Sequence, residues 1–392
     1  MKYITNFNIE NKTVILRCDL NVSIKDNKII DDTRIVKSLK TINYILDHKA
    51  KLIIMSHLGK IKCEEDKIKN SMEIVYKRLN ELLPNKITFV PYTKDERIKK
   101  ELDNIDYGHG ILLENTRFED LNNKKESNCD EELSKYWASL GDIFINDAFG
   151  MLHRGHASNL GISTYLPSGI GFLVKEELTN LNKLDNPKRP YAIIMGGAKV
   201  SDKIKIIDNL ITKVDKLFIG GAMAFTFLKS KGIKVGNSLV EDEYLDYCAK
   251  LLKDYPNKII LPIDFNGSLE GFKNDPDAVT YNIMNIPDNF IGMDIGPKSI
   301  GIYKDELSEI KTIFWNGPLG VYEFDKYQTG TKEILNYIAN NIETTIVGGG
   351  DIVSCANKFG FNKKLTYIST GGGASLEYIV NKDLPGLKNI KE

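Results

Sequence analysis

The sequence lacks the features that mark several specialised classes of protein. Its five cysteines are scattered, odd in number and without a C-x-x-C pair, which predicts a reduced cytoplasmic chain with no disulfide framework and no zinc knuckle. There is no run of about 18 apolar residues and no apolar segment at the N-terminus, so we expect neither membrane insertion nor secretion. Lys plus Arg equals Asp plus Glu at 53 each, which leaves no excess positive charge for nucleic acid or an anionic membrane.

Several nucleotide and metal motifs are also missing. The sequence contains no G-x-x-x-x-G-K-[ST], which excludes a P-loop enzyme, and no H-E-x-x-H. The absence of a strict G-x-G-x-x-G weakens an NAD dehydrogenase or protein-kinase interpretation. His153 and His156 have a spacing that metal ligands can use, but Arg154 between them favours an anion site.

What is present is an alternation of short β-branched runs and amphipathic helical stretches, which predicts parallel α/β architecture. A chain of 392 residues is long enough for two domains of about 150–200 residues. In the first half we expect strands at 12–22, 51–57, 86–92, 111–118 and 142–149, and helices at 31–49 and 71–83. In the second half we expect strands at 191–197, 216–221, 258–265, 312–317, 344–350 and 365–370, and helices at 201–213 and 327–342. Residues 171–190 predict a helix between the two halves, and the Asn-Pro and Arg-Pro steps are expected to end this helix. We expect the last residues of the chain either to fray or to pack across both domains.

The predicted strands of the first half end in polar and cationic residues. The chain has only seven Arg, all before residue 190, so an Arg at a strand end is unlike its ordinary lysine-rich surface. Guanidinium groups bind phosphate and carboxylate in a bidentate way, which predicts an anion site made by Arg34, Arg117 and Arg154 with the nearby histidines. We expect Arg17 to form a structural pair with Asp19, and Arg78 and Arg97 to be solvated helix residues.

The predicted strands of the second half end in glycine instead. A single such exit is more often a tight turn, but the second half has five: 196–198, 220–222, 316–318, 348–351 and 371–373. Bare backbone N–H groups can approach an anion directly, so we expect a multi-phosphate or nucleotide site. Lys199 and Lys203 are expected on one face of the opening turn of a helix, as a phosphate clamp. Asp351 is either the N-cap of the next helix or the carboxylate that holds a nucleotide-bound Mg²⁺.

These residues form motifs that resemble phosphoglycerate kinase over nearly the whole chain and in that family's order. The first half carries RCDLNV (17–22), SHLG (56–59), LLENTRF (112–118) and NDAFGMLHRGHAS (146–158). The second carries MGGAKVSDKI (195–204), GGAMAFTFLK (220–229), GMDIGP (292–297), FWNGPLGVYE (314–323), GGGD (348–351) and STGGGASLE (369–377). Each motif is weak alone, but the ordered set is specific.

The resemblance implies a glycolytic kinase that transfers a phosphoryl group reversibly from 1,3-bisphosphoglycerate to ADP, giving 3-phosphoglycerate and MgATP by in-line transfer in a closed inter-domain cleft. It implies two doubly wound, Rossmann-like α/β domains joined by a hinge helix: a triose-phosphate domain (1–170), the hinge (171–188), a nucleotide domain (189–375) and a C-terminal segment (376–392) that packs back on the first domain. A cytoplasmic monomer with Mg²⁺ bound together with the nucleotide is expected, with no nucleic-acid or membrane partner.

By motif match, the resemblance also assigns site residues. The catalytic residues would be Arg34, Lys199, Lys203, Gly372 and Gly373. The substrate would be bound by Asp19, Leu20, Asn21, Arg34, His57, Leu58, Gly59, Lys60, Arg117 and Arg154. The nucleotide would be bound by Gly197, Ala198, Lys203, Gly221, Gly292, Asn316, Pro318, Glu323, Gly349, Gly350, Asp351 and Ile352, with Asp351 on the metal.

The sequence departs from the family pattern at four motif positions. Ser23 replaces a Pro, Lys60 an Arg, Ala222 a Gly, and Ile352 a residue whose hydroxyl usually meets a nucleotide phosphate. These departures support one alternative from another class, a non-catalytic sensor of a phosphometabolite or nucleotide. Because Arg34, Lys199, Lys203 and the Gly371–Gly373 run are intact, we expect an active enzyme.

Overall fold

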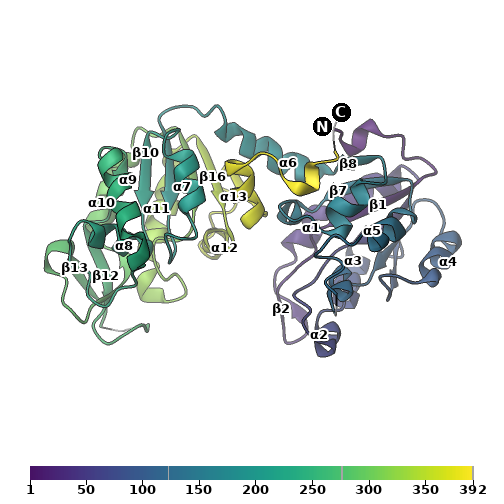
Figure 1. Ribbon diagram of the computed structural model, residues 1–392, viewed down its shortest axis with the longest axis horizontal. Coiled ribbons are helices and arrows are strands. Elements are labelled where there is room, and N and C mark those ends of the chain that lie inside the picture. Colours follow the sequence, from purple (N-terminus) through teal and green to yellow (C-terminus); the bar gives the residue numbers. More distant parts are fainter. Residues whose placement is uncertain (122, 275–276, 391–392) are drawn as a thin grey trace. The chain divides into compact units, whose positions relative to one another are not determined.

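The computed structural model describes residues 1–121, 123–274 and 277–390, which form two compact units (Figure 1). Unit 1 comprises Met1–Thr179 and Asn381–Glu392, and unit 2 comprises Asn180–Val380. The last two residues of the expected C-terminal segment, 391 and 392, lie outside the described residues. Within the described ranges, no helix combines the length and the apolar character that crossing a membrane requires.

Unit 1 is built on a parallel sheet with the strand order β5-β6-β4-β1-β7-β8. Its strands are β1 (Thr13–Cys18), β4 (Lys51–Met55), β5 (Ile87–Val90), β6 (Gly110–Leu113), β7 (Ile143–Asp147) and β8 (Ser168–Ile170). The central strands β1, β4 and β7 are buried along almost their whole length because helices cover both faces of the sheet. A hairpin of β2 (Ile24–Lys25) and β3 (Lys28–Ile29) lies apart from this sheet.

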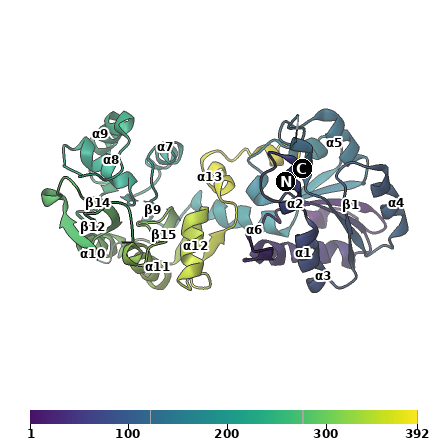
Figure 2. The same ribbon diagram turned by 90° about the horizontal axis from the view of Figure 1, so that it is seen from below.

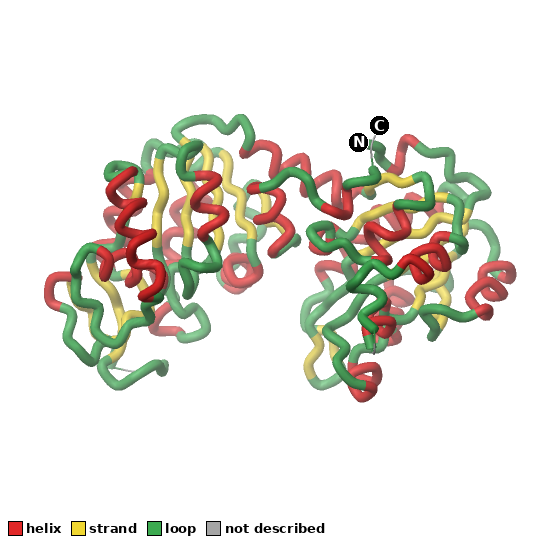
Figure 3. Tube along the Cα trace, in the orientation of Figure 1, coloured by secondary structure: helices red, strands yellow, loops and turns green. Residues whose placement is uncertain are grey.

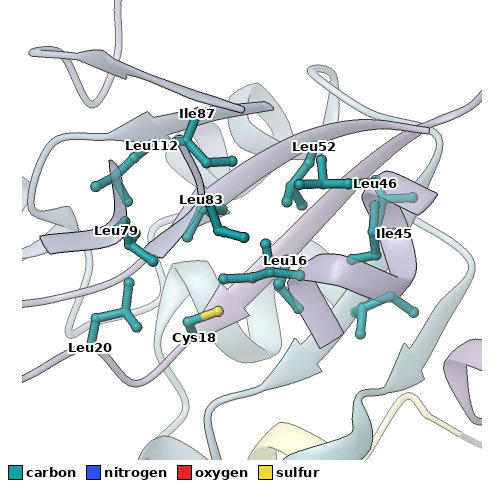
Figure 4. Packing of buried hydrophobic residues seen from close by; sticks show 14 of the residues in the cluster. Leu16, Cys18, Leu20, Ile45, Leu46, Leu52, Leu79, Leu83, Ile87 and Leu112 are labelled. Atoms are coloured by element: carbon teal, nitrogen blue, oxygen red, sulfur yellow. The ribbon is translucent and has the colours of Figure 1, made fainter. Parts of the chain in front are cut away.

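The helices of unit 1 enclose two separate hydrophobic cores. Figure 4 shows the first core, where Leu16 and Leu52 of the sheet pack against Ile45 of helix α1 (Thr33–Asp47) and Leu79 of helix α3 (Glu73–Leu82). The second lies on the opposite face and contains Trp137 of α5. Side chains alternate between the two cores along each strand, as the period of two requires. The helices of unit 1 are α1 (Thr33–Asp47), α2 (Glu64–Lys69), α3 (Glu73–Leu82), α4 (Glu96–Asn104), α5 (Glu131–Ala138) and the first part of α6 (Phe172–Leu181), with short turns η1 (Ile4–Asn6), η2 (Thr116–Asp120), η3 (Phe149–Met151), η4 (Ala157–Gly161) and η9 (Pro385–Leu387).

Unit 2 has a second parallel sheet, in the order β11-β10-β9-β15-β16-β17. Its strands are β9 (Tyr191–Met195), β10 (Lys216–Ile219), β11 (Ile259–Ile260), β15 (Thr312–Asn316), β16 (Thr344–Gly348) and β17 (Tyr367–Ser369). Figure 3 shows these strands side by side between helices. Figure 2 shows α7 (Ile204–Leu210), α8 (Met223–Ser230) and α9 (Leu245–Asp254) on one face, and α10 (Pro297–Leu307), α11 (Thr329–Asn341) and α12 (Gly350–Lys358) on the other. The remaining elements are α13 (Gly373–Val380) and the short turns η5 (Asn182–Leu184), η6 (Asp242–Tyr244), η7 (Ile283–Asn285) and η8 (Asp325–Tyr327).

The predicted parallel α/β class is confirmed, but one predicted strand of unit 2 is wrong. The run 258–265 divides into β11 and β12 (Asp264–Ser268), and β12 leaves the parallel sheet to pair antiparallel with β13 (Val279–Asn282) and β14 (Ile291–Ile295). The break has a chemical basis, because Asp264 is buried and accepts a hydrogen bond from the backbone N–H of Ser299 at the start of α10. The small antiparallel sheet therefore depends on a contact distant in sequence.

Helix α6 crosses the boundary between the units. Its N-terminus is fixed in unit 1, where the Phe172 N–H donates to the Thr41 hydroxyl (3.0 Å) and the Val174 N–H donates to the Asp147 carboxylate (3.0 Å). The helix ends at Leu181, before the Pro steps expected to stop it. The segment from Asn381 joins unit 1, where the Gly386 N–H donates to the Leu152 carbonyl (2.8 Å).

Candidate functional site

Each parallel sheet contains a point at which the strand order reverses direction. In unit 1 this point lies between β1 and β7, and in unit 2 it lies between β9 and β15. Connections leave such neighbouring strands in opposite directions, which opens a crevice at their carboxyl ends where ligands bind. The polar exits of unit 1 and the glycine exits of unit 2 lie at these two sheet edges.

At the edge of unit 1, Asp19, Asn21 and Arg34 lie together. Arg34 is in the first turn of α1, and its Nη1 lies 3.0 Å from Asp19 Oδ1 and 3.1 Å from the Asn21 carbonyl oxygen. The Asn21 side chain in turn accepts a hydrogen bond from the Gly59 N–H (2.8 Å). Arg17 is buried, as expected of a structural residue, and the charge of Asp19 favours its charged form, but the direct ion pair of Asp19 is with Arg34 rather than with Arg17.

Two of the predicted substrate-binding residues, Leu20 and Leu58, have buried side chains and lie at this edge with their backbone groups. The Leu20 N–H donates to the Ser56 hydroxyl (2.9 Å), and the Leu58 carbonyl accepts from the Asn115 side-chain amide (2.7 Å). Lys60, two residues further on, is exposed.

Cationic groups gather at the same edge, and each disfavours the charge of the others. Burial, then the charges of Arg17, Arg117 and Arg34, lower the pKa of His57 well below its ordinary value. Burial and the neighbouring Arg154 lower the pKa of Arg117. The Arg117 Nε is buried and has no hydrogen-bond partner among the residues described by the structure. An anion bound here would relieve the mutual repulsion and supply that partner.

The two candidate metal-binding histidines have different surroundings. His156 is buried with its Nδ1 3.7 Å from Glu126 Oε1, whereas the His153 ring accepts a hydrogen bond from the exposed Arg154 (3.2 Å). In the ranges that the structure describes, no three His, Cys, Asp or Glu side chains gather as a metal site.

Of the two Arg residues expected to be solvated, only Arg97 is. It lies exposed against Tyr92 and pairs with Asp95. The prediction for Arg78 is wrong: this residue bridges Asp32 (2.7 Å) and Glu81, and so connects α3 to the start of α1. The residues around Arg78 contain no indication of this ion pair, because Asp32 is distant along the chain.

Unit 2 contains a cavity of about 520 Å³ at the edge of its parallel sheet. It is lined by Gly197, Ala198, Gly221, Gly292, Pro318, Glu323 and Asp351 from the predicted nucleotide set. Sequence reasoning missed the rest of the lining: Asn237, Leu239, Phe272, Ile291, Met293, Gly320, Val321 and Tyr322, together with the departure residue Ala222. Phe272 is 65% exposed, which is unusual for an aromatic side chain, and no pattern in the sequence distinguishes it.

The two lysines of the predicted clamp are not on one helical turn. Helix α7 begins at Ile204, so Lys203 is its N-cap and Lys199 lies exposed in the preceding loop. The Lys203 ammonium donates to the Asn316 side-chain oxygen, and the Asn316 amide donates to the Gly348 carbonyl. Burial lowers the pKa of Lys203, and Asp202 and Asp351 oppose this shift. Asn316 is thus a buried link between the lysine and the glycine loop.

The loop before α12 needs glycine for two reasons. Gly349 is the N-cap of α12 with a φ of +113°, and a Cβ there would lie 2.2 Å from Asn316 Nδ2. Asp351 is therefore not the N-cap; it is exposed in the first turn of α12 and lines the cavity. Ile352 is fully buried and is not part of the cavity lining, so its side chain offers a ligand no contact in this structure.

The last glycine run forms the start of α13. Gly372 has a φ of +52°, and a Cβ at this position would meet no atom within 4 Å, so its backbone faces open space. Gly373 is the first residue of the helix. A Cβ at Gly350, the first residue of α12, would likewise meet no atom within 4 Å. Free N–H groups at helix starts attract anions.

A cationic edge on one doubly wound unit and a glycine-lined cavity on another are features of kinases that act on small molecules. The comparisons with known proteins agree. The phosphoglycerate kinase family model matches residues 4–382. The phosphoglycerate kinase of Fusobacterium nucleatum is 50% identical over 99% of both chains, and that of Listeria monocytogenes is 48% identical over 100% of this chain and 99% of the relative.

The solved phosphoglycerate kinase of Coxiella burnetii superposes with a TM-score of 0.87 at 36% identity, covering 99% of this chain and 98% of the other. That of Pyrococcus horikoshii gives 0.85 at 30% identity over 100% and 98%. The chain belongs to the phosphoglycerate kinase family and is an enzyme of glycolysis, which acts on small-molecule substrates.

Proposed function

We propose that the chain transfers a phosphoryl group reversibly between 1,3-bisphosphoglycerate and ADP, giving 3-phosphoglycerate and MgATP, with the triose bound by unit 1 and the nucleotide by unit 2. The observation that carries this proposal is the cationic cluster of unit 1. Arg34, Arg117, Arg154 and His57 meet at one sheet edge, where the pKa values of His57 and Arg117 are lowered. Such a cluster suits a small, highly anionic ligand, which would relieve the repulsion among its cationic groups.

In unit 1, Arg117, Arg154 and His57 hold the phosphate that is not transferred. Asp19 and Asn21 bind the hydroxyl and carboxyl region of the glycerate, since they present a carboxylate and an amide beside Arg34. Leu20, Leu58 and Gly59 contribute backbone groups only. Lys60 adds a positive point charge at the rim.

In unit 2, the cavity holds the nucleoside, with Glu323 on the ribose and Gly221 and Gly292 against the base. The phosphates lie over Gly197, Ala198 and Pro318. They also lie against the N-terminal end of α12, which comprises Gly349, Gly350 and Ile352. Lys203 and Lys199 meet the migrating phosphoryl group with Arg34, and the N–H groups of Gly372 and Gly373 complete the cradle. A loose transition state needs such positioning and charge more than it needs covalent chemistry.

Two exposed carboxylates, Glu323 and Asp351, line this cavity, and Asp351 is the one at the glycine-rich start of α12. Mg²⁺ is commonly held by one or two carboxylates together with substrate phosphates, so the donor set fits a metal that arrives with the nucleotide. When bound, Mg²⁺ neutralises charge on the β- and γ-phosphate oxygens.

The attacking oxygen in either direction belongs to a phosphate or a carboxylate, which is already ionised. No general base is therefore required. We propose that the reaction is an in-line transfer after the two units close on their substrates, because closure excludes water and prevents hydrolysis. We also propose a cytoplasmic monomer; light scattering after size exclusion tests the oligomeric state.

The test is coupled ATP formation by the purified full chain from 1,3-bisphosphoglycerate and ADP. Turnover that requires both substrates and Mg²⁺ is expected. Binding of both ligands without turnover would contradict the proposal and favour the sensor alternative, which the departures Ser23, Lys60, Ala222 and Ile352 would then explain. A structure with nucleotide and 3-phosphoglycerate bound tests the residue assignments one by one.

A further inference from the structure

A buried carboxylate lies behind the cationic edge of unit 1 and has no place in the roles given above. Glu126 lies in the turn before α5, and its side chain is fully buried. One oxygen accepts a hydrogen bond from the Ser158 N–H (2.9 Å), and the other accepts from the Ser158 hydroxyl and lies 3.7 Å from His156 Nδ1. Burial raises the pKa of Glu126, but the interactions with His156, Arg17 and Ser158 lower it further than burial raises it, so the group is ionised.

Ser158 connects this carboxylate to a buried arginine. Its hydroxyl donates to Glu126 and accepts a hydrogen bond from Arg17 Nε (2.8 Å). A hydroxyl has one proton, so this arrangement fixes the direction of both bonds. Arg17 has no exposed surface, and Glu126 is the largest charge that opposes the effect of burial on its pKa. Glu126 therefore compensates the charge of Arg17 and orients it through Ser158.

Arg17 in turn determines the protonation of His57. The Arg17 Nη2 lies 3.3 Å from His57 Nδ1. A guanidinium can only donate hydrogen bonds, so Nδ1 must accept and carries no proton. The proton of the neutral ring is then on Nε2. After burial, the main groups that lower the pKa of His57 are three guanidinium groups and a second imidazole: Arg17, Arg117, Arg34 and His156.

We propose that Glu126 is a positioning residue that acts through Ser158 and Arg17 to hold His57 neutral with its proton on Nε2, as a hydrogen-bond donor to the substrate phosphate. This inference rests on the proposed role of His57 at the triose site. Without Glu126, Arg17 would lose the largest charge that compensates its own, and its guanidinium would lose the anchor that reaches Nε through Ser158, although Nη1 would keep its bond to the Cys18 carbonyl and Asp19 its weaker compensating charge. The imidazole would then lose its fixed tautomer.

The first test replaces Glu126 by Gln in the full chain. Glu126→Gln keeps the size of the side chain and removes its charge. We expect the KM for 3-phosphoglycerate to rise on the order of tenfold, because a buried polar network loses an acceptor, while kcat and the KM for ATP change less than about twofold. Ser158→Ala should give the same split, since it removes the link and keeps the carboxylate. Ser38→Ala is the matched control, because Ser38 is about equally buried in unit 1 but its hydroxyl donates to the Ile35 carbonyl of its own helix.

The second test measures the tautomer itself in the ligand-free protein. Correlation of the ring protons and nitrogens of ¹⁵N-histidine-labelled protein, with the His57→Gln spectrum for assignment, should show an unprotonated Nδ1 and a protonated Nε2. In Ser158→Ala this pattern should change to a mixture of tautomers or a protonated ring. A proton on Nδ1 in the wild type would overturn the inference even where a variant fails to fold. An unchanged His57 spectrum and an unchanged KM in Ser158→Ala would do the same.

The two proposals fail in different ways. Absent ATP formation by the wild type contradicts the proposed function, whatever the state of His57. Normal ATP formation with the wrong tautomer contradicts only the role of Glu126.

Discussion

The two units have parallel sheets with the same kind of reversal in strand order, yet their ligand-binding edges are built from different groups. At the edge of unit 1, side chains from strand ends and from α1 gather, and Arg34 and Arg117 supply charge beside His57. At the edge of unit 2, glycines with positive φ at Gly197, Gly221, Gly349 and Gly372 remove side chains instead. A small anion needs neutralising charge from several directions. A long polyphosphate needs close approach along a backbone, which a Cβ would block.

One topology can therefore support two kinds of anion site. If the proposed sites are right, the binding energy in unit 1 resides in charges that single substitutions can remove. In unit 2 much of it would reside in backbone N–H groups, which a substitution can affect only by displacing the chain. Lys203 is the exception, a charged side chain at the glycine edge.

Removal of that lysine is the sharpest test of the comparison and should have the largest effect. Lys203→Ala should lower kcat by roughly 10²–10³-fold, the usual result of deleting one preorganised electrostatic group. The affinity for 3-phosphoglycerate, measured by calorimetry, should stay nearly unchanged, because we propose that unit 1 binds that ligand. Lys205→Ala, at an exposed position on α7, is the control. A near-normal kcat in Lys203→Ala would refute the assignment to the transferred group.

Removal of one guanidinium from unit 1 should have the next largest effect. Arg117→Ala should weaken 3-phosphoglycerate binding by about 10–100-fold, as expected for the loss of hydrogen bonds to a charged group. Nucleotide binding should not change. Arg97→Ala is the control, since this Arg of the same unit is exposed and pairs with Asp95. Equal losses for both ligands would show that the substitution damages the fold and would remove the contrast between the units.

A side chain added to the glycine edge tests the backbone half of the comparison. Gly349→Ala should destabilise the protein by about 1–3 kcal/mol, because the residue has a φ of +113° and a Cβ there would lie 2.2 Å from Asn316 Nδ2. The KM for ATP should rise with it, since Asn316 also holds Lys203.

Thermal unfolding with and without nucleotide measures both effects. Gly301→Ala is the matched control, because Gly301 lies within α10 with open space around it, and this change should stabilise by about 0.5–1 kcal/mol. Unchanged stability and KM in Gly349→Ala would mean that the loop accepts a side chain.

The smallest effect is expected at the rim of unit 1. Lys60→Arg should tighten 3-phosphoglycerate binding by about twofold to fivefold, because a guanidinium binds phosphate in a bidentate way and an ammonium does not. Calorimetry with 3-phosphoglycerate measures the change. An affinity that stays constant or falls would indicate that Lys60 does not contact the substrate.

Much of the fold could be predicted from local patterns. The alternation of apolar runs and amphipathic helices indicated the parallel sheets, and the core strands such as β1 and β9 fall inside the predicted ranges. The predicted ranges were too long at their carboxyl ends. Asp19 to Val22 continue an apolar alternation, but their polar groups bond to Arg34 and Gly59 rather than to a neighbouring strand.

The errors at the site have the same origin. The prediction that Lys199 lies on the opening turn of a helix was wrong. Residues 199–203 form a loop that is held by a residue distant in the sequence, Glu241, which accepts hydrogen bonds from the Ser201 N–H and hydroxyl. The apolar half of the cavity was missed because its residues come from separate segments, such as the loops that carry Leu239 and Phe272 and the strand β14 that carries Met293. Neither spacing nor residue type connects them in the sequence.

The sequence by itself determined the architecture and the chemistry of each edge, because periodicity, the position of Arg among Lys and the position of Gly after apolar runs are local properties. Only the tertiary structure decided which groups meet. It paired Arg34 with Asp19, joined Lys203 to the glycine loop through Asn316, and connected Glu126 to His57 through Ser158 and Arg17. Hydrogen bonds and ion pairs act over a few ångströms in space, and the separation of residues along a folded chain does not reveal that distance.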